Sequence, residues 1–207
     1  AEQTGYIYAL TRWALKTACE EALHWQIPDR PPVRVGLNFT PGMFSLPDLN
    51  ERICAALDAT GLPPECLEIE ITEHAFMEAR EHTIEALEAL RDLGIRIALD
   101  DFGTGFSAMG YLGRLPLDCM KIDRAFVTDL PASPVANGIA RAVGMLADSC
   151  GLEAIAEGVE REEQVNALKA LRCGYAQGFY YSPPIEGETI RELIRAGATL
   201  PAGAHAR

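Results

Sequence analysis

The chain has 207 residues, a formal net charge of −12 and a sequence pI near 4.8. This length suits one domain with a sizeable core, and 48% hydrophobic with 23% charged residues is ordinary for a globular protein. The acidic balance, without a Lys/Arg run, argues against nucleic acid and anionic membranes as partners. No stretch approaches the roughly 20 apolar residues of a membrane span.

Helical spacing and turn residues predict helices at 6–25, 49–59, 81–93, 134–150 and 161–172 and from about 188, with a short helix ending near 111. Apolar runs predict strands at 33–39, 66–73, 95–98, 117–123, 153–160 and 175–180. We expect a loosely ordered tail at 197–207. Alternation without hairpin signals predicts a parallel α/β sheet, either open or closed into a barrel. A full eight-stranded barrel takes roughly 250 residues, so about the first two strands would lie upstream of this chain.

The six cysteines are scattered and show no C-x-x-C spacing. Most fall inside apolar runs, which predicts buried thiols in a reducing compartment. The six are Cys19, Cys54, Cys66, Cys119, Cys150 and Cys173.

Two adjacent carboxylates, Asp100 and Asp101, follow the strand predicted at 95–98. A turn permitted by Gly103 and Gly105 would let both side chains reach one pocket, where they repel each other unless a proton or cation lies between them. The alternative is that one Asp caps the next helix. That alternative leaves the second carboxylate unexplained, so this stretch favours a cation site.

Polar side chains also end the other predicted strands. In a parallel barrel the active groups gather at the carboxyl ends of the strands. Oxygen donors without Cys or His favour Mg²⁺, Mn²⁺ or Ca²⁺ over zinc, and several converging carboxylates favour two ions, a clamp suited to phosphoryl transfer. The strand-end residues are Asn38, Glu70, Asp100, Asp101, Lys121, Asp123, Glu157 and Gln177.

Two of these residues allow more than one interpretation. Lys121 could orient a nucleophilic water or neutralise charge on a phosphate, or it could form a salt bridge to Asp123 or a neighbour. Glu157 could accept the proton of the attacking water or act as one more metal ligand. A Schiff-base role for Lys121 would leave the carboxylates unexplained. The acidic run 160–163 is interpreted as a solvated helix start.

Six segments, in order along nearly the whole chain, resemble the motifs of the EAL domain family. They are LNFTP at 37–41, EIEITE at 68–73, DDFGTGFS at 100–107, KIDRAFV at 121–127, AEGVE at 156–160 and AQGF at 176–179. The resemblance implies a TIM-type (β/α)8 barrel over residues 1–196 that hydrolyses cyclic di-GMP to linear pGpG with two Mg²⁺ or Mn²⁺ ions.

The resemblance also implies roles for the strand-end residues. Asn38, Glu70 and Asp100 resemble ligands of one metal ion. Asp100 would be shared between the two ions, with Asp101 on the second. Lys121 resembles the residue that holds the catalytic water.

Further roles follow from the same comparison. Glu157 resembles the general base or a second-metal contact, and Asp123 and Gln177 resemble other residues of the catalytic pocket. Glu73 resembles the residue that braces the loop after the Asp pair, a loop tied in the family to substrate binding and dimerisation. In that loop Phe106 stands where Tyr is common.

The family's namesake Glu-Ala-Leu, and an Arg that contacts substrate phosphate, would lie before Ala1. With that segment we expect a phosphodiesterase; without it we expect a non-catalytic cyclic di-GMP receptor or regulatory scaffold with an incomplete metal site. The resemblance further implies a homodimer, an upstream sensor or cyclase domain, and a cytoplasmic location, either free or as the cytoplasmic part of a membrane-anchored protein.

Overall fold

The computed structural model describes residues 6–46, 48–77, 81–103 and 112–197. The chain divides into two compact units, residues 1–71 with 75–97 and residues 72–74 with 98–207. No helix within the described residues is long and apolar enough to cross a membrane. The domain limits predicted from the sequence, 1–196 and 197–207, stay a prediction.

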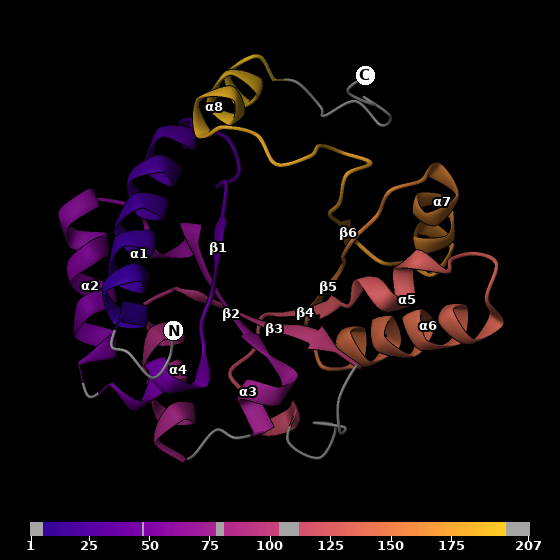
Figure 1. The fold of residues 1–207 in the computed structure, drawn as a ribbon, viewed down its shortest axis with the longest axis horizontal. Helices are drawn as coiled ribbons and strands as arrows, with labels where there is room; N and C mark the ends of the chain where they lie inside the picture. The colour runs from indigo at the N-terminus through magenta and orange to yellow at the C-terminus, as the bar shows by residue number, and fades with distance from the viewer. Residues whose placement is uncertain (1–5, 47, 78–80, 104–111, 198–207) are drawn as a thin grey trace. The chain divides into compact units, whose positions relative to one another are not determined.

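The first unit consists of helices packed against parallel strands. Strand β1 pairs with β2 so that Asn38 stands opposite Glu70, and helix α1 packs against α2 and β1 (Figure 1). Its elements are α1 (Tyr6–Trp25), β1 (Val35–Asn38), the 3-10 helices η2 (Pro41–Ser45) and η3 (Pro64–Cys66), α2 (Leu49–Thr60), most of β2 (Leu67–Thr72) and α4 (Glu81–Asp92).

The second unit contains a parallel sheet in which β3, β4, β5 and β6 pair in chain order. Helix α6 packs against α5, β4 and β5 (Figure 1). The elements of this part of the chain are β3 (Arg96–Phe102), η5 (Leu112–Arg114), β4 (Cys119–Ile122), α5 (Arg124–Thr128), α6 (Pro134–Ser149), β5 (Glu153–Ala156), α7 (Glu162–Ala170), β6 (Tyr175–Ala176) and α8 (Gly187–Arg195). A short helix, α3 (Glu73–Met77), follows β2.

Helix α6 shows how local sequence positions the sheet. Ser133 caps it, its Oγ accepting a hydrogen bond from the Ala136 amide at 3.2 Å, and Pro134 takes the first turn. The helix then buries a small-residue stripe at helical spacing, Ala136, Ala140, Val143 and Ala147. Small side chains let the helix axis approach the strands closely, and they fill the space between helix and sheet.

The predicted α/β class is confirmed, because every pair of neighbouring strands assigned above is parallel and helices separate the strands. All the predicted strands except β3 are shorter in the structure, and the last two differ most. Strand β5 ends at Ala156 because Gly158 turns the chain with φ +66°, and β6 has only two residues before Gly178, at φ +151°. Periodicity also missed the five-residue helices α3 and α5. The predicted short helix near 111 and the tail beyond Gly197 lie outside the described residues.

The prediction for the cysteines is only partly correct. Cys19, Cys66 and Cys119 are buried, whereas Cys54 and Cys173 are half-buried and Cys150 is exposed. Cys150 directly follows α6 at its C-terminal cap, where the helix leaves the core.

Candidate active site

The Asp pair lies inside β3, because the strand continues to Phe102. Leu99 pairs with Met120 and Phe102 with Ile122, so two aspartates stand against Lys121 alone, which is a β-bulge. Asp101 takes the left-handed conformation, with φ +54°, and its amide donates to Asp100 Oδ1 at 3.0 Å. The turn expected from the glycines therefore begins at Asp101 itself, and the bulge brings two neighbouring carboxylates to one side.

Lys121 lies between carboxylates from two other strand ends. Its Nζ is 2.6 Å from Glu157 Oε1 and 3.6 Å from Asp100 Oδ1, and the lysine is only 3% exposed. Burying an ammonium group costs several kcal/mol unless opposite charges compensate it, and these two carboxylates supply that compensation. The ion-pair interpretation of Lys121 is therefore correct, with Asp100 and Glu157 as its partners. A role in orienting water is compatible with this position.

Glu157 is held from a second direction by Gln177. The Gln177 side-chain amide donates to Glu157 Oε1 at 2.7 Å, the same oxygen that faces Lys121. The backbone continues the sheet on both sides, because Glu157 N donates to Ile122 O at 3.0 Å and Gln177 N donates to Ala156 O at 2.8 Å. Two fixed strand ends thus orient this carboxylate.

Gly178 makes the position of Gln177 possible. A Cβ at residue 178 would collide with the backbone of Val159. That backbone is anchored by Val159 N donating to Gln177 O at 3.0 Å and by Tyr180 N donating to Val159 O at 2.9 Å. The segment after β6 therefore lies directly against the segment after β5, which carries Glu157.

Negative charge accumulates at the bulge. Partial burial, followed by the charge of Asp100, raises the pKa of Asp101 above its ordinary value, and a hydrogen bond with the Asp123 carboxyl raises it further. Lys121 acts in the opposite direction. Asp123 also caps α5, its Oδ1 accepting from the Ala125 amide at 2.8 Å.

Glu73, at the start of α3, is 2% exposed. Its Oε2 accepts a hydrogen bond from Gly103 N at 3.0 Å, directly after β3. The contact ties the exit of the Asp-pair strand to this carboxylate. Phe106 lies outside the described residues.

Asn38 and Glu70 belong to the first unit. They face each other across the β1–β2 pair, each at or near the carboxyl end of its strand. Gly36 leaves space for the Glu70 side chain, since a Cβ there would collide with the carboxylate.

Asp100, Asp101 and Glu157 each place a carboxylate oxygen within 4.8 Å of the others. Three carboxylates against one lysine leave an excess of negative charge. The pKa of Asp101 is raised first by burial and then by the charge of Asp100. Hard oxygen donors in this arrangement fit Mg²⁺ or Mn²⁺.

Sequence reasoning missed the surroundings of this cluster. A pocket of about 590 Å³ opens beside Glu157 and Gln177, with Arg124 and the 59% exposed Phe179 in its wall. Arg124 Nη2 contacts Glu160 Oε1 at 2.6 Å, and both side chains stay exposed, which agrees with the solvated position expected for the acidic run 160–163. The sequence could have indicated both residues, because each belongs to a matched motif: Arg124 follows Asp123, and Phe179 follows Gly178.

The fold and the carboxylates around the buried lysine together define the class: a parallel α/β protein with a candidate divalent-cation site at its strand ends. The chain belongs to the EAL domain family, whose match covers residues 1–184. This membership confirms the resemblance read from the motifs and, with it, the TIM-type barrel as the fold class.

The individual relatives agree. The cyclic di-GMP phosphodiesterase NbdA of Pseudomonas aeruginosa is 38% identical over 196 residues, 95% of this chain and 25% of that protein. A structure of the phosphodiesterase PaMucR in complex with c-di-GMP superposes with a TM-score of 0.86 at 34% identity, covering 92% of this chain and 77% of the other.

The BlrP1 protein of Klebsiella pneumoniae, in a complex with manganese and cyclic di-GMP, gives a TM-score of 0.77 at 29% identity, covering 87% of this chain and 45% of the other. The chain spans about a quarter of the length of the first curated relatives that it matches.

Proposed function

We propose that this chain hydrolyses cyclic di-GMP to linear pGpG with two bound Mg²⁺ or Mn²⁺ ions. The observation that carries the proposal is the convergence of Asp100, Asp101 and Glu157 oxygens within 4.8 Å beside the buried Lys121. Family membership, a phosphodiesterase relative and a related structure in complex with manganese and cyclic di-GMP support it.

Asp100 and Asp101 would hold the ions, since the bulge presents both carboxylates on one side. When bound, such ions supply a nucleophilic water at neutral pH and stabilise the leaving oxygen. Asn38 and Glu70 are proposed as further ligands from the family resemblance alone.

Glu157 would take the proton of the attacking water. Lys121 and Gln177 fix its carboxylate through one oxygen, so the group is oriented before substrate arrives. Lys121 also places a positive charge 3.6 Å from Asp100, and this charge would neutralise negative charge that develops on the phosphate. Asp123 would hold the Asp101 side of the cluster through the hydrogen bond between their carboxyl groups.

Homodimer formation, an upstream sensor or cyclase domain and a cytoplasmic location remain proposals that rest on the family resemblance. The greater length of the curated relatives supports the second of these.

The test is hydrolysis of cyclic di-GMP by this chain with Mg²⁺ or Mn²⁺, followed by chromatography for pGpG. We expect turnover that EDTA abolishes and that Glu157→Gln lowers by about 10²–10⁴-fold, the usual contribution of a positioned general base. Glu163→Gln, an exposed position on α7, is the matched control and should keep full activity.

Calorimetry with cyclic di-GMP separates the remaining outcomes. Tight binding without turnover, in this chain and after addition of an upstream Glu-Ala-Leu segment, would replace the proposal with the receptor function. Absence of both binding and turnover in the two chains would contradict any cyclic di-GMP function.

A further inference from the structure

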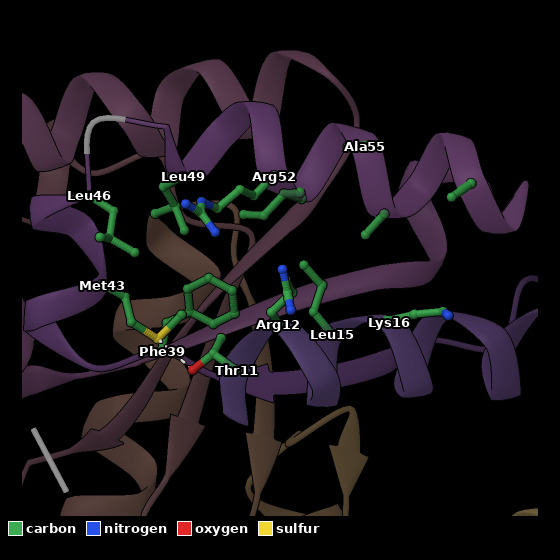
Figure 2. A pocket seen from close by; sticks show the side chains of 13 residues that line it. Thr11, Arg12, Leu15, Lys16, Phe39, Met43, Leu46, Leu49, Arg52 and Ala55 are labelled. Carbon is green, nitrogen blue, oxygen red and sulfur yellow. Dashed lines mark hydrogen bonds between the residues drawn. The ribbon is translucent and has the colours of Figure 1, made fainter. Parts of the chain in front are cut away.

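A second pocket, of about 350 Å³, lies within the first unit between α1, η2 and α2 (Figure 2). Its walls are mainly apolar and include Leu15, Phe39, Met43, Leu49, Ile53 and Ala56. The Thr11 hydroxyl, which also lines it, donates to the Met43 sulfur at 3.5 Å. A volume of this size falls in the range of small-molecule sites, most of which are lined by apolar side chains.

Three cations surround this apolar space: Arg12 and Lys16 from α1 and Arg52 from α2. Arg52 contacts Asp48 at 2.7 Å and Lys16 contacts Glu20 at 3.6 Å. Arg12 has no carboxylate partner among the residues that the structure describes, and Figure 2 shows its guanidinium extending from α1 toward α2.

The cationic rim is unusual for this chain, which has 18 Lys and Arg against 30 Asp and Glu. An apolar cavity alone would accept any hydrocarbon of suitable size. A guanidinium in the pocket wall, with no carboxylate partner among the described residues, selects a ligand with an anionic group, because charge-assisted hydrogen bonds to carboxylate are about twice as strong as neutral ones.

We propose that this pocket binds a single-chain amphiphile with an anionic head, such as a medium-chain fatty acid. The hydrocarbon chain would lie among Leu15, Phe39 and Met43, and the carboxylate would meet Arg12 with Arg52 opposite it. This site is separate from the carboxylate cluster, and its occupancy does not depend on the proposed hydrolysis.

The experiment is isothermal titration of the full chain with octanoate, decanoate and dodecanoate, each below its micelle-forming concentration. Each added methylene should tighten the dissociation constant about fourfold while the pocket still has room. Dodecanol, with the same chain and no charge, should bind at least about tenfold more weakly than dodecanoate.

Two variants locate the site. Arg12→Gln keeps much of the side-chain length and should weaken dodecanoate binding about tenfold, whereas Arg141→Gln on α6 should not. Ala56→Phe should abolish binding by filling the pocket from its wall, with Ala142→Phe, an exposed position on α6, as its control. Circular dichroism would confirm that each variant is folded, and Arg12→Gln tests the site even where Ala56→Phe does not fold.

Failure of dodecanoate to bind, or equal binding of dodecanol, would overturn the proposal. Undiminished binding by folded Ala56→Phe would place the ligand elsewhere and overturn it as well. Binding to phosphatidylglycerol vesicles without binding of free dodecanoate would replace the enclosed pocket with a lipid surface.

Discussion

Two ion pairs in the second unit have equal lengths and opposite surroundings. Lys121 Nζ lies 2.6 Å from Glu157 Oε1, and Arg124 Nη2 lies 2.6 Å from Glu160 Oε1. The side chains of the first pair are 4% and 17% exposed, whereas those of the second are 62% and 44% exposed. Both pairs join the segment of β4 and α5 to the segment that follows β5.

The difference shows that burial, and not distance, sets the energetic weight of each contact. The exposed pair is solvated and screened by salt, so its formation changes stability little. The buried pair has lost most of its water, so each charge depends on the other. Removal of one partner leaves the second as an uncompensated buried charge. A site that must hold a carboxylate in one orientation gains from the buried arrangement.

The largest expected effect is that of Lys121→Met, which leaves Asp100 and Glu157 without their shared cation. We expect the free energy of unfolding to fall by about 3–5 kcal/mol in EDTA, as for other buried ion pairs that lose one partner. Urea unfolding measures this loss, with Lys169→Met on the exposed face of α7 as the control. A loss below about 1 kcal/mol would show that the buried pair is no more costly to break than a surface pair.

Gly178→Ala should have the next largest effect, because it disturbs the segment after β5, which carries Glu157 and Glu160. The added Cβ would meet the Val159 backbone, and the residue would have to keep φ +151°. Overpacking and strain together should cost about 3 kcal/mol.

The control for this substitution has the opposite expected sign. Gly138→Ala in α6, where a Cβ meets nothing within 4 Å, should stabilise the chain by roughly 0.5–1 kcal/mol. Urea unfolding measures both variants. An unchanged free energy of unfolding in Gly178→Ala would contradict the close contact between residue 178 and the Val159 backbone.

Sequence reasoning predicted the members of the buried cluster because parallel strands end at one edge of a sheet. Asp100 and Lys121 lie in two strands and Glu157 directly follows a third, and all three were placed together on that rule. The β-bulge was not predicted, because it depends on the register between β3 and β4. The requirement for glycine at 178 likewise arises from contact with Val159, which no local pattern contains.

The excess charge around the buried pair leads to a smaller prediction. The folded-state pKa of Asp101 is raised by burial and by Asp100. The folded chain therefore binds a proton more tightly than the unfolded chain, so stability falls as pH rises from about 4, the ordinary Asp pKa, through the raised value. In EDTA, Asp101→Asn should be more stable than the parent at pH 7, with the difference vanishing toward pH 4.

Thermal unfolding across this pH range measures the difference, and Asn also tolerates the left-handed conformation at 101. Under the proposed function, addition of Mn²⁺ should reverse the order, because binding would stabilise the parent, which keeps Asp101 as a proposed ligand, more than the variant. If the parent were more stable than Asp101→Asn in EDTA at every pH, burial and the charge of Asp100 would not destabilise the ionised Asp101.

The smallest expected effect is that of Glu160→Gln, which removes one charge of the exposed pair and leaves the Arg124 side chain packed over Gly158. We expect a loss of no more than about 0.5 kcal/mol in low salt, and none in 1 M NaCl, where screening acts over about 3 Å. Urea unfolding at both salt concentrations measures the change, with Glu163→Gln as the control. Because the two ion pairs have the same length, a loss as large as that of Lys121→Met would mean that burial does not govern their strength, and the contrast between them would fail.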